Sequence, residues 1–118
     1  MTVLKCLFNG IEVETCSDSG SDLVVLGWNH YKSLCHKLGY EFNLQPTRKL
    51  AWAANGTNLN FVGKTMMTIS NKHASKQYPV FVQKGFMRGF PLLSEDCLIE
   101  LGYIRYSHDG SFAKNIIQ

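Results

Sequence analysis

The sequence has no closely spaced cysteine pair, no long apolar run and no block of charge of one sign. Its cysteines lie far apart, so the paired spacing of a zinc ribbon or redox motif is missing; they are Cys6, Cys16, Cys35 and Cys97. No apolar run approaches the roughly 20 residues of a membrane helix. Residues 1–10 lack the apolar region and cleavage site of a secretory signal. We therefore expect a reduced, intracellular chain, located in the cytoplasm, with no membrane partner.

The charge of the chain is weak and dispersed. Twelve Lys and Arg against nine Asp and Glu give a net charge of +3, and the basic residues form no stripe. Binding to phosphates relies on such a stripe, so a nucleic-acid-binding β-barrel is disfavoured and no nucleic-acid partner is expected. Cys35, His36 and His30 lie on neighbouring turns of an expected helix, but a zinc site needs three or four ligands and a matching second pair is missing. We expect neither a metal nor another cofactor, and core packing for the cysteines.

Short strand patterns separated by turn residues dominate the chain. Residues 3–8 and 11–16 are rich in β-formers and flank Asn9-Gly10, the strongest two-residue hairpin signal. A second hairpin is expected at about residues 50–63, with turn residues at its centre. Gly63, in the returning strand of that hairpin, indicates a bulge or a close backbone approach.

Two helices and further strands complete the pattern. Residues 29–38 carry apolar side chains at helical spacing, and residues 95–101 follow Ser94, an N-cap residue with acids in the first turn behind it. A strand is expected at 78–82 and a last hairpin at 104–117. With 118 residues and 45% hydrophobic content, we predict a single domain over residues 1–118. The predicted fold is all-β, a closed barrel of hairpins with one short C-terminal helix and a second helix near 29–38.

Asp18 stands out because it lies between two expected core strands. The amphipathic strand 11–16 leads into Asp18-Ser19-Gly20, and an apolar run at 23–26 leaves it. A turn of Asp, Ser and Gly is by itself usually structural. An ionisable residue held between two core elements, however, points to a functional site.

The order of parts resembles the retropepsins, the aspartic protease domains of retroviruses and LTR retrotransposons. Their signature, Asp-Ser/Thr-Gly-Ala/Ser between two apolar strands, matches residues 18–21. The hairpin at 50–63 corresponds to their flap, and Phe90-Pro91-Leu92-Leu93 followed by 97–102 resembles their apolar pair and short helix. The resemblance covers nearly all of residues 3–106.

The resemblance implies an aspartic endopeptidase that functions as a homodimer. The chemistry needs two carboxylates that share one proton, one acting as general base on water and the other donating to the substrate carbonyl. Neither Asp96 nor Asp109 is followed by Ser/Thr-Gly, so the second carboxylate must come from Asp18 of another copy across a two-fold axis. Asp18, Ser19 and Gly20 are the implied catalytic residues.

The implied substrate is an extended polypeptide lying between the flap and the floor of the site. Ser21 completes the catalytic turn, and Asn55 and Gly56 form the flap turn. The implied walls of the substrate-binding pockets are Leu26, Trp52, Leu92 and Leu93.

Two positions depart from the retropepsin pattern. Ser17 stands where the family has an apolar residue, and Ser94 stands where it has glycine. The Ser94 side chain would either press on the catalytic turn or serve as the helix N-cap. These departures favour an alternative, a domesticated or degenerate retropepsin fold that keeps the dimer and serves as an assembly module. A cysteine nucleophile is not indicated, because no cysteine lies in a strand-to-helix elbow.

Overall fold

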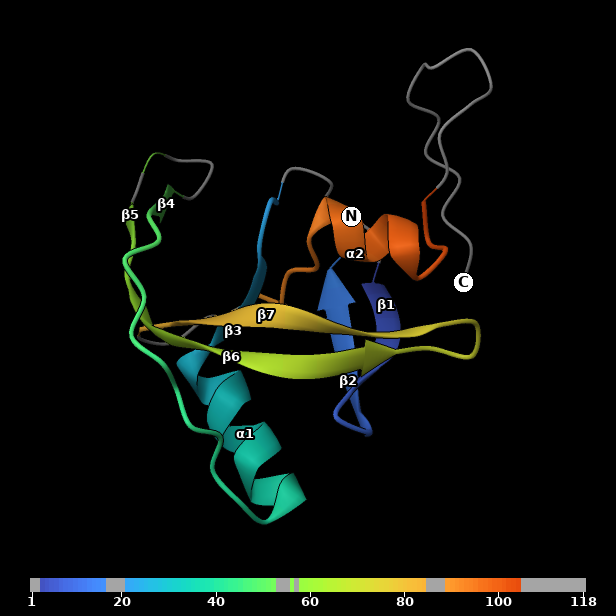
Figure 1. The fold of residues 1–118 in the computed structure, drawn as a ribbon, viewed down its shortest axis with the longest axis horizontal. Coiled ribbons are helices and arrows are strands. Elements are labelled where there is room, and N and C mark those ends of the chain that lie inside the picture. Colours follow the sequence, from blue (N-terminus) through green and yellow to red (C-terminus); the bar gives the residue numbers. More distant parts are fainter. Residues whose placement is uncertain (1–2, 17–20, 53–55, 57, 85–88, 105–118) are drawn as a thin grey trace.

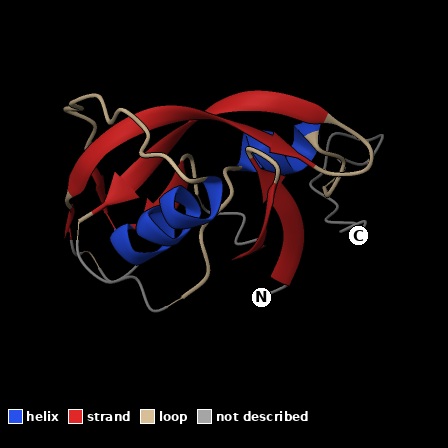
Figure 2. Cartoon of the chain, turned by 90° about the horizontal axis from the view of Figure 1, so that it is seen from below, coloured by secondary structure: helices blue, strands red, loops and turns tan. Residues whose placement is uncertain are grey.

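The computed structural model describes all residues except 1–2, 17–20, 53–55, 57, 85–88 and 105–118 (Figure 1). A long antiparallel hairpin of β6 (Phe61–Ser70) and β7 (Ser75–Gln83) runs through its centre. The helix α1 (Trp28–Leu38) lies on one side of this hairpin and α2 (Glu95–Glu100) on the other (Figures 1 and 2). The predicted C-terminal hairpin, 104–117, falls almost wholly outside the described residues.

The chain opens with the predicted hairpin of β1 (Val3–Phe8) and β2 (Ile11–Cys16). Asn9 and Gly10 have φ of 48° and 88°, the left-handed values that a two-residue turn of this kind requires. Phe8 therefore pairs directly with Ile11, and the register continues to Val3 opposite Cys16.

The main sheet has five strands in the order β2-β1-β6-β7-β3, with β3 (Val24–Gly27) parallel to β7. The all-β class is confirmed, but the sheet does not close as the predicted barrel: among the described residues its edges are β2 and β3. Leu92 instead bridges the two edges, pairing with Cys16 of β2 and with Val25 of β3.

Strand β7 extends beyond the predicted 78–82 and contains Pro79 within its length. This proline pairs with Met66 of β6, and the pairing of β3 with β7 begins one residue later at Val80. Pro79 therefore lies where β7 is still a local edge, so its missing N–H costs no ladder bond.

Both expected helices are present. α1 covers Trp28–Leu38 and ends at Gly39 in the left-handed conformation, and α2 covers Glu95–Glu100 after the N-cap Ser94. Neither of these helices, the two in the described part of the chain, is long and apolar enough to cross a membrane.

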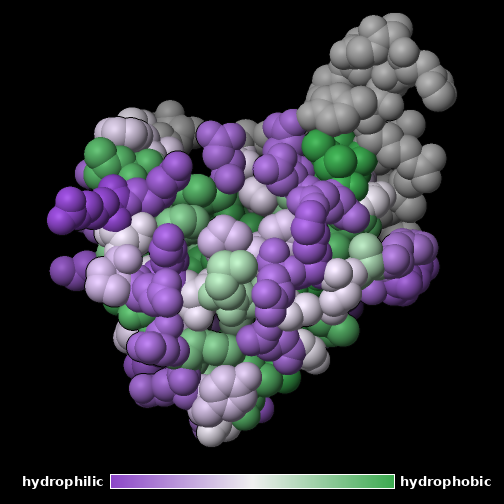
Figure 3. Space-filling view, in the orientation of Figure 1, coloured by the Kyte–Doolittle hydropathy of each residue, from purple (hydrophilic) through white to green (hydrophobic). Residues whose placement is uncertain are grey.

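The main core lies between the β1–β2 hairpin, the β6–β7 hairpin and α2. It consists mostly of buried side chains from these elements and from the residues after α2, with β3 and α1 also contributing; among them are Leu4, Phe8, Ile69, Val80, Leu98 and Ile104. A smaller cluster under α1 joins Tyr31 and Cys35 to Val82, with Phe42 and Leu44 packed on it. On the outer face in Figure 3, polar and apolar residues are interleaved.

In the second predicted hairpin, the paired strands are short. β4 (Ala51–Trp52) pairs antiparallel with β5 (Asn58–Leu59) as a separate two-stranded sheet. It rises on the same side of the β6–β7 hairpin as α2 (Figure 1).

Candidate functional site

The residues on both sides of segment 17–20 are held by one stretch of backbone, residues 91–95. At the end of β2, the Cys16 N–H donates to the Pro91 carbonyl (2.8 Å), and the Leu93 N–H donates to the Cys16 carbonyl (3.4 Å). On the other side, the Glu95 N–H donates to the Ser21 carbonyl (3.0 Å). Asp18, Ser19 and Gly20, as well as Ser17, lie outside the described residues.

Ser21 fixes the entry into β3. Its hydroxyl donates to the Leu23 carbonyl (2.5 Å), and the Leu23 N–H donates to the Ser21 hydroxyl oxygen (3.3 Å). This local turn chemistry is typical of serine and directs the chain into the buried strand that starts at Val24.

Leu92 occupies the gap between the two strands that flank the segment. Its N–H and C=O both bond to Val25, each at 3.0 Å, while its neighbours bond to Cys16. The Leu92 side chain is half-buried. One short stretch of main chain therefore ties the strand that enters segment 17–20 to the strand that leaves it.

Two predicted pocket residues are core residues here. The side chains of Leu26 and Leu93 are both 0% exposed, so in this structure they offer no surface to a substrate and pack beneath the site instead. The structure brings Ser21, Leu26, Leu92 and Leu93 into one region around β3 and residues 91–95.

The remaining predicted substrate-binding residues belong to the separate β4–β5 hairpin. Trp52, in β4, is 59% exposed, and Gly56 is exposed with φ of 84°. Asn55 lies outside the described residues.

Ser94 serves as the N-cap of α2. It is buried, and its hydroxyl oxygen accepts a hydrogen bond from the Cys97 N–H at 3.2 Å. The sequence predicted that this side chain would either press on the segment around Asp18 or serve as the helix N-cap, and the structure shows the N-cap. The hydroxyl satisfies an N–H at the start of the helix, as a good cap residue does.

Two of the buried cysteines, Cys6 and Cys97, are poorly suited to nucleophilic chemistry. Burial raises the pKa of the Cys6 thiol to about 11, partly offset by a contact with the Thr15 hydroxyl. Burial also raises the pKa of the Cys97 thiol to about 12, with a further increase from nearby Cys6. Since the thiolate is the reactive form, these two side chains are inert at neutral pH.

No metal centre is found in the part of the chain that the structure describes. It contains no group of three or more His, Cys, Asp or Glu side chains that could hold a metal ion.

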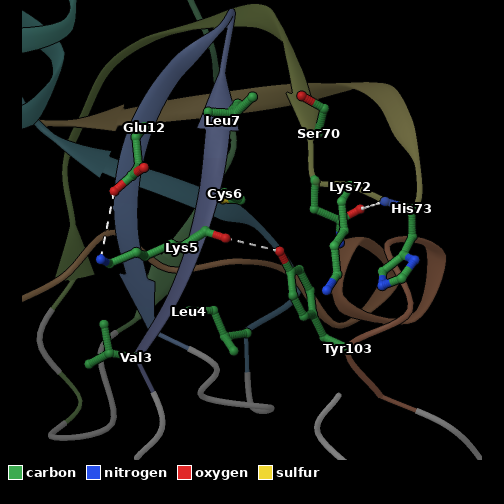
Figure 4. Close-up of a pocket in the computed structure, with 11 residues that line it drawn as sticks. Val3, Leu4, Lys5, Cys6, Leu7, Glu12, Ser70, Lys72, His73 and Tyr103 are labelled. Atoms are coloured by element: carbon green, nitrogen blue, oxygen red, sulfur yellow. Dashed lines mark hydrogen bonds and ion pairs between the residues drawn. The ribbon is translucent and has the colours of Figure 1, made fainter. Parts of the chain in front are cut away.

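A hollow of about 710 Å³ lies elsewhere on the surface, between β1, the turn after β6 and Tyr103 (Figure 4). The Tyr103 hydroxyl donates to the Lys5 carbonyl at 3.2 Å, and Asn71 donates to the Leu101 carbonyl at 2.8 Å. None of the residues that line the hollow belongs to the predicted site.

Solved structures share this arrangement of elements. The EIAV protease in complex with the inhibitor HBY-793 aligns with a TM-score of 0.68 and 23% sequence identity, over 86% of this chain and 88% of that one. This chain has a retropepsin-like fold. The retroviral protease-like domain of Ddi1 from Leishmania major aligns with a TM-score of 0.57 and 15% identity, over 84% of this chain and 75% of that one. The sequence matches no protein-family model and no curated protein.

In this retropepsin-like fold, the supporting roles of Cys16, Pro91 and Glu95 were not predicted. All three act through backbone N–H and C=O groups, which every residue type offers apart from the missing N–H of proline. The only sequence signal was the position of Cys16 at the end of an amphipathic strand, and this position does not indicate which backbone groups it bonds to.

Proposed function

We propose that this protein is an aspartic endopeptidase and that it works as a homodimer, with Asp18 of each subunit supplying one of two catalytic carboxylates. The observation that carries the proposal is the anchoring of both Cys16 and Ser21 on residues 91–95. A catalytic carboxylate must be held in a defined geometry, and the attachment of the residues on both sides of Asp18 to one short stretch of backbone meets that need. The retropepsin-like fold supports the same function.

In this proposal, two Asp18 carboxylates share one proton because two like charges in close proximity resist ionising together. The ionised carboxylate takes a proton from a water molecule as its oxygen attacks the peptide carbonyl carbon, and the protonated one donates to the carbonyl oxygen. The tetrahedral intermediate then collapses and the C–N bond breaks. The leaving amine takes the proton that the first carboxylate had removed from water, and the second carboxylate recovers its proton from a hydroxyl of the intermediate as the product carboxyl group forms. Ser19 and Gly20 hold the carboxylates in place by hydrogen bonds.

The substrate is proposed to be an extended polypeptide. Ser21 and the half-buried Leu92 border the turn, and the β4–β5 hairpin, with Asn55 and Gly56 at its turn, is the element proposed to cover the peptide. Trp52 supplies a large apolar surface on that hairpin. Leu26 and Leu93 are left out of the proposed contact surface because they are fully buried.

The test is cleavage of a random peptide library at several values between about pH 4 and 7, because the activity of a carboxylate pair depends on pH. We expect the wild type to cut, and we expect Asp18→Asn to lose at least about 10²- to 10⁴-fold in rate, since an amide cannot act as the general base. Asp96→Asn is the matched control, because Asp96 is exposed at the start of α2, and it should retain activity. Sedimentation of both variants reports whether the dimer persists.

One outcome would favour the assembly-module alternative instead. If the wild type forms a dimer but cuts no peptide, and Asp18→Asn changes neither stability nor its pH dependence, the endopeptidase proposal fails. The departure from the retropepsin pattern at Ser17 is the feature that keeps this alternative open.

A further inference from the structure

Gly63 lies in direct contact with the backbone that leads into the β4–β5 hairpin. A Cβ atom at this position would be 2.7 Å from the Gln45 carbonyl oxygen, closer than real Cβ atoms approach, and 3.1 Å from the Leu44 Cβ, a tight contact. Gly63 is not among the glycines with positive φ. It is therefore required for space and not for an unusual backbone conformation.

Two hydrogen bonds hold this contact together. The Gln45 N–H donates to the Lys64 carbonyl (2.8 Å), and the Lys64 N–H donates to the Gln45 carbonyl (2.9 Å), as in one hydrogen-bonded pair of an antiparallel sheet. Pro46 follows Gln45 and biases it towards the extended conformation that this pairing needs. The register shift between Phe61 and Gly63 lies beside the pair, and such a bulge bends its strand.

The chain before Gln45 is fixed to α1. The Tyr31 hydroxyl donates to the Phe42 carbonyl at 2.7 Å, and Phe42 and Leu44 pack on the cluster of Tyr31, Cys35 and Val82. The segment that leads into the hairpin is therefore fixed to α1 and the sheet up to Gln45.

The chain that leaves the hairpin is also fixed close to its base. The Lys84 N–H donates to the Asn60 carbonyl at 2.7 Å, which ties the residue between β5 and β6 to the end of β7. Between these two attachments, the pairs Ala51↔Leu59 and Trp52↔Asn58 are the strand pairing present in the described part of the hairpin.

We propose that Gly63 and Gln45 form a clamp, and that this clamp sets the position of the β4–β5 hairpin relative to the five-stranded sheet. The stems of the hairpin are attached to the body at Gln45 and at Asn60, so a change in the Gly63–Gln45 contact displaces the hairpin at one of its two attachments. The clamp also sets how readily a polypeptide reaches Asp18, and this link to substrate access rests on the proposed function. Gly63 and Gln45 are positioning residues and touch neither substrate nor the reacting atoms.

The first experiment measures amide hydrogen exchange in Gly63→Ala, whose methyl group displaces the Gln45 backbone. We expect the Gln45 and Lys64 amides to exchange about 2- to 10-fold faster, the factor that corresponds to losing one backbone hydrogen bond, with β1 amides unchanged. Gly89→Ala is the matched control, since a Cβ at Gly89 meets nothing within 4 Å, and it should leave all of these amides unchanged. Should Gly63→Ala fail to fold, Gln45→Pro removes the Gln45 donor without adding an atom at Gly63.

The outcomes separate the clamp from the proposed function. Unchanged exchange at Lys64, or equal acceleration throughout the sheet, overturns the clamp whether or not the protein cuts peptides. With a cleaved peptide in hand, we expect Gly63→Ala to raise KM more than it lowers kcat, whereas Gly89→Ala alters neither. A normal KM in a variant whose Lys64 amide exchanges faster overturns the link to substrate access, and absence of cleavage by the wild type overturns the proposed function alone.

Discussion

The five-stranded sheet and the β4–β5 hairpin are stabilised in opposite ways. In the sheet, β6 and β7 pair along nearly their whole length and bury side chains such as Met67, Ile69 and Val80 on one core. In the hairpin, two residues of each strand pair and Trp52 is exposed. The sheet is therefore held by burial of apolar area, whereas the hairpin depends on its attachments at the base. This is the division expected of a rigid body that carries an element able to move locally.

The largest expected effect comes from breaking the sheet core. Phe8→Ala should lower the free energy of unfolding by about 3 to 5 kcal/mol, because Phe8 is 0% exposed in the main core. Urea denaturation followed by circular dichroism measures this change. Since the free energy of unfolding of a domain is about 5 to 15 kcal/mol, this loss would be a large fraction of the total.

Truncation of an aromatic side chain in the hairpin should have a much smaller effect than in the sheet. Trp52→Ala removes a larger aromatic side chain, yet it should change the free energy of unfolding by no more than about 0.5 kcal/mol. Similar losses in the two variants would contradict the division between the sheet and the hairpin.

An intermediate effect is expected from the buried thiol of Cys6 at alkaline pH. Its pKa is about 11 in the folded protein against 9.0 for the free group, so the folded state holds the proton more tightly than the unfolded state. This contribution is fully present below pH 9 and is lost as pH rises through the folded pKa. Since one pKa unit corresponds to about 1.4 kcal/mol, the loss is roughly 2 kcal/mol by pH 11.

The measurement is the slope of unfolding free energy against pH between about 9 and 11. Cys6→Ala should show a shallower slope than the wild type, even though its stability at neutral pH is lower because of the small cavity. Equal slopes for the two proteins would mean that the thiol is not held in its protonated form.

A smaller effect than that of the Cys6 thiol is expected at the junction between the sheet and the candidate site. Ser94→Ala should cost about 1 kcal/mol, because it removes the oxygen that accepts from the Cys97 N–H. Ser94→Gly should cost only about a few tenths of a kcal/mol, as glycine is an acceptable N-cap. Thermal unfolding of the two variants side by side tests the order, and a larger loss for glycine than for alanine would refute the cap.

Local chemistry allowed several elements to be predicted from the sequence. Asn9-Gly10 predicted the first turn, Ser94 the start of α2, and Gly63 a bulge or a close backbone approach; the turn and the helix start are present, and both features are found at Gly63. Each of these features depends on the conformational or capping preference of one or two residues.

The pairing of distant strands could not be predicted from the sequence in the same way. Nothing in Val24–Gly27 indicates that it lies parallel to β7, and the predicted closed barrel was wrong because the edges β2 and β3 meet Leu92 and not each other. The candidate catalytic residues were identified mainly by their resemblance to retropepsins, and the backbone groups that anchor Cys16 and Ser21 carry no side-chain signature. Which distant backbone groups pair is decided by the packing of the whole domain.

The Leu92 bridge also bears on the solubility of the protein. β3 is a fully buried apolar strand at a sheet edge, and an unprotected edge of this kind is a template for sheet growth between molecules. Leu92 occupies both the N–H and the C=O of Val25, so an incoming chain finds these groups already bonded. The opposite edge, β2, instead exposes Glu12 and Glu14, whose charge discourages pairing with another strand. The two edges are therefore protected against aggregation by different means, one by a covering segment and the other by charge.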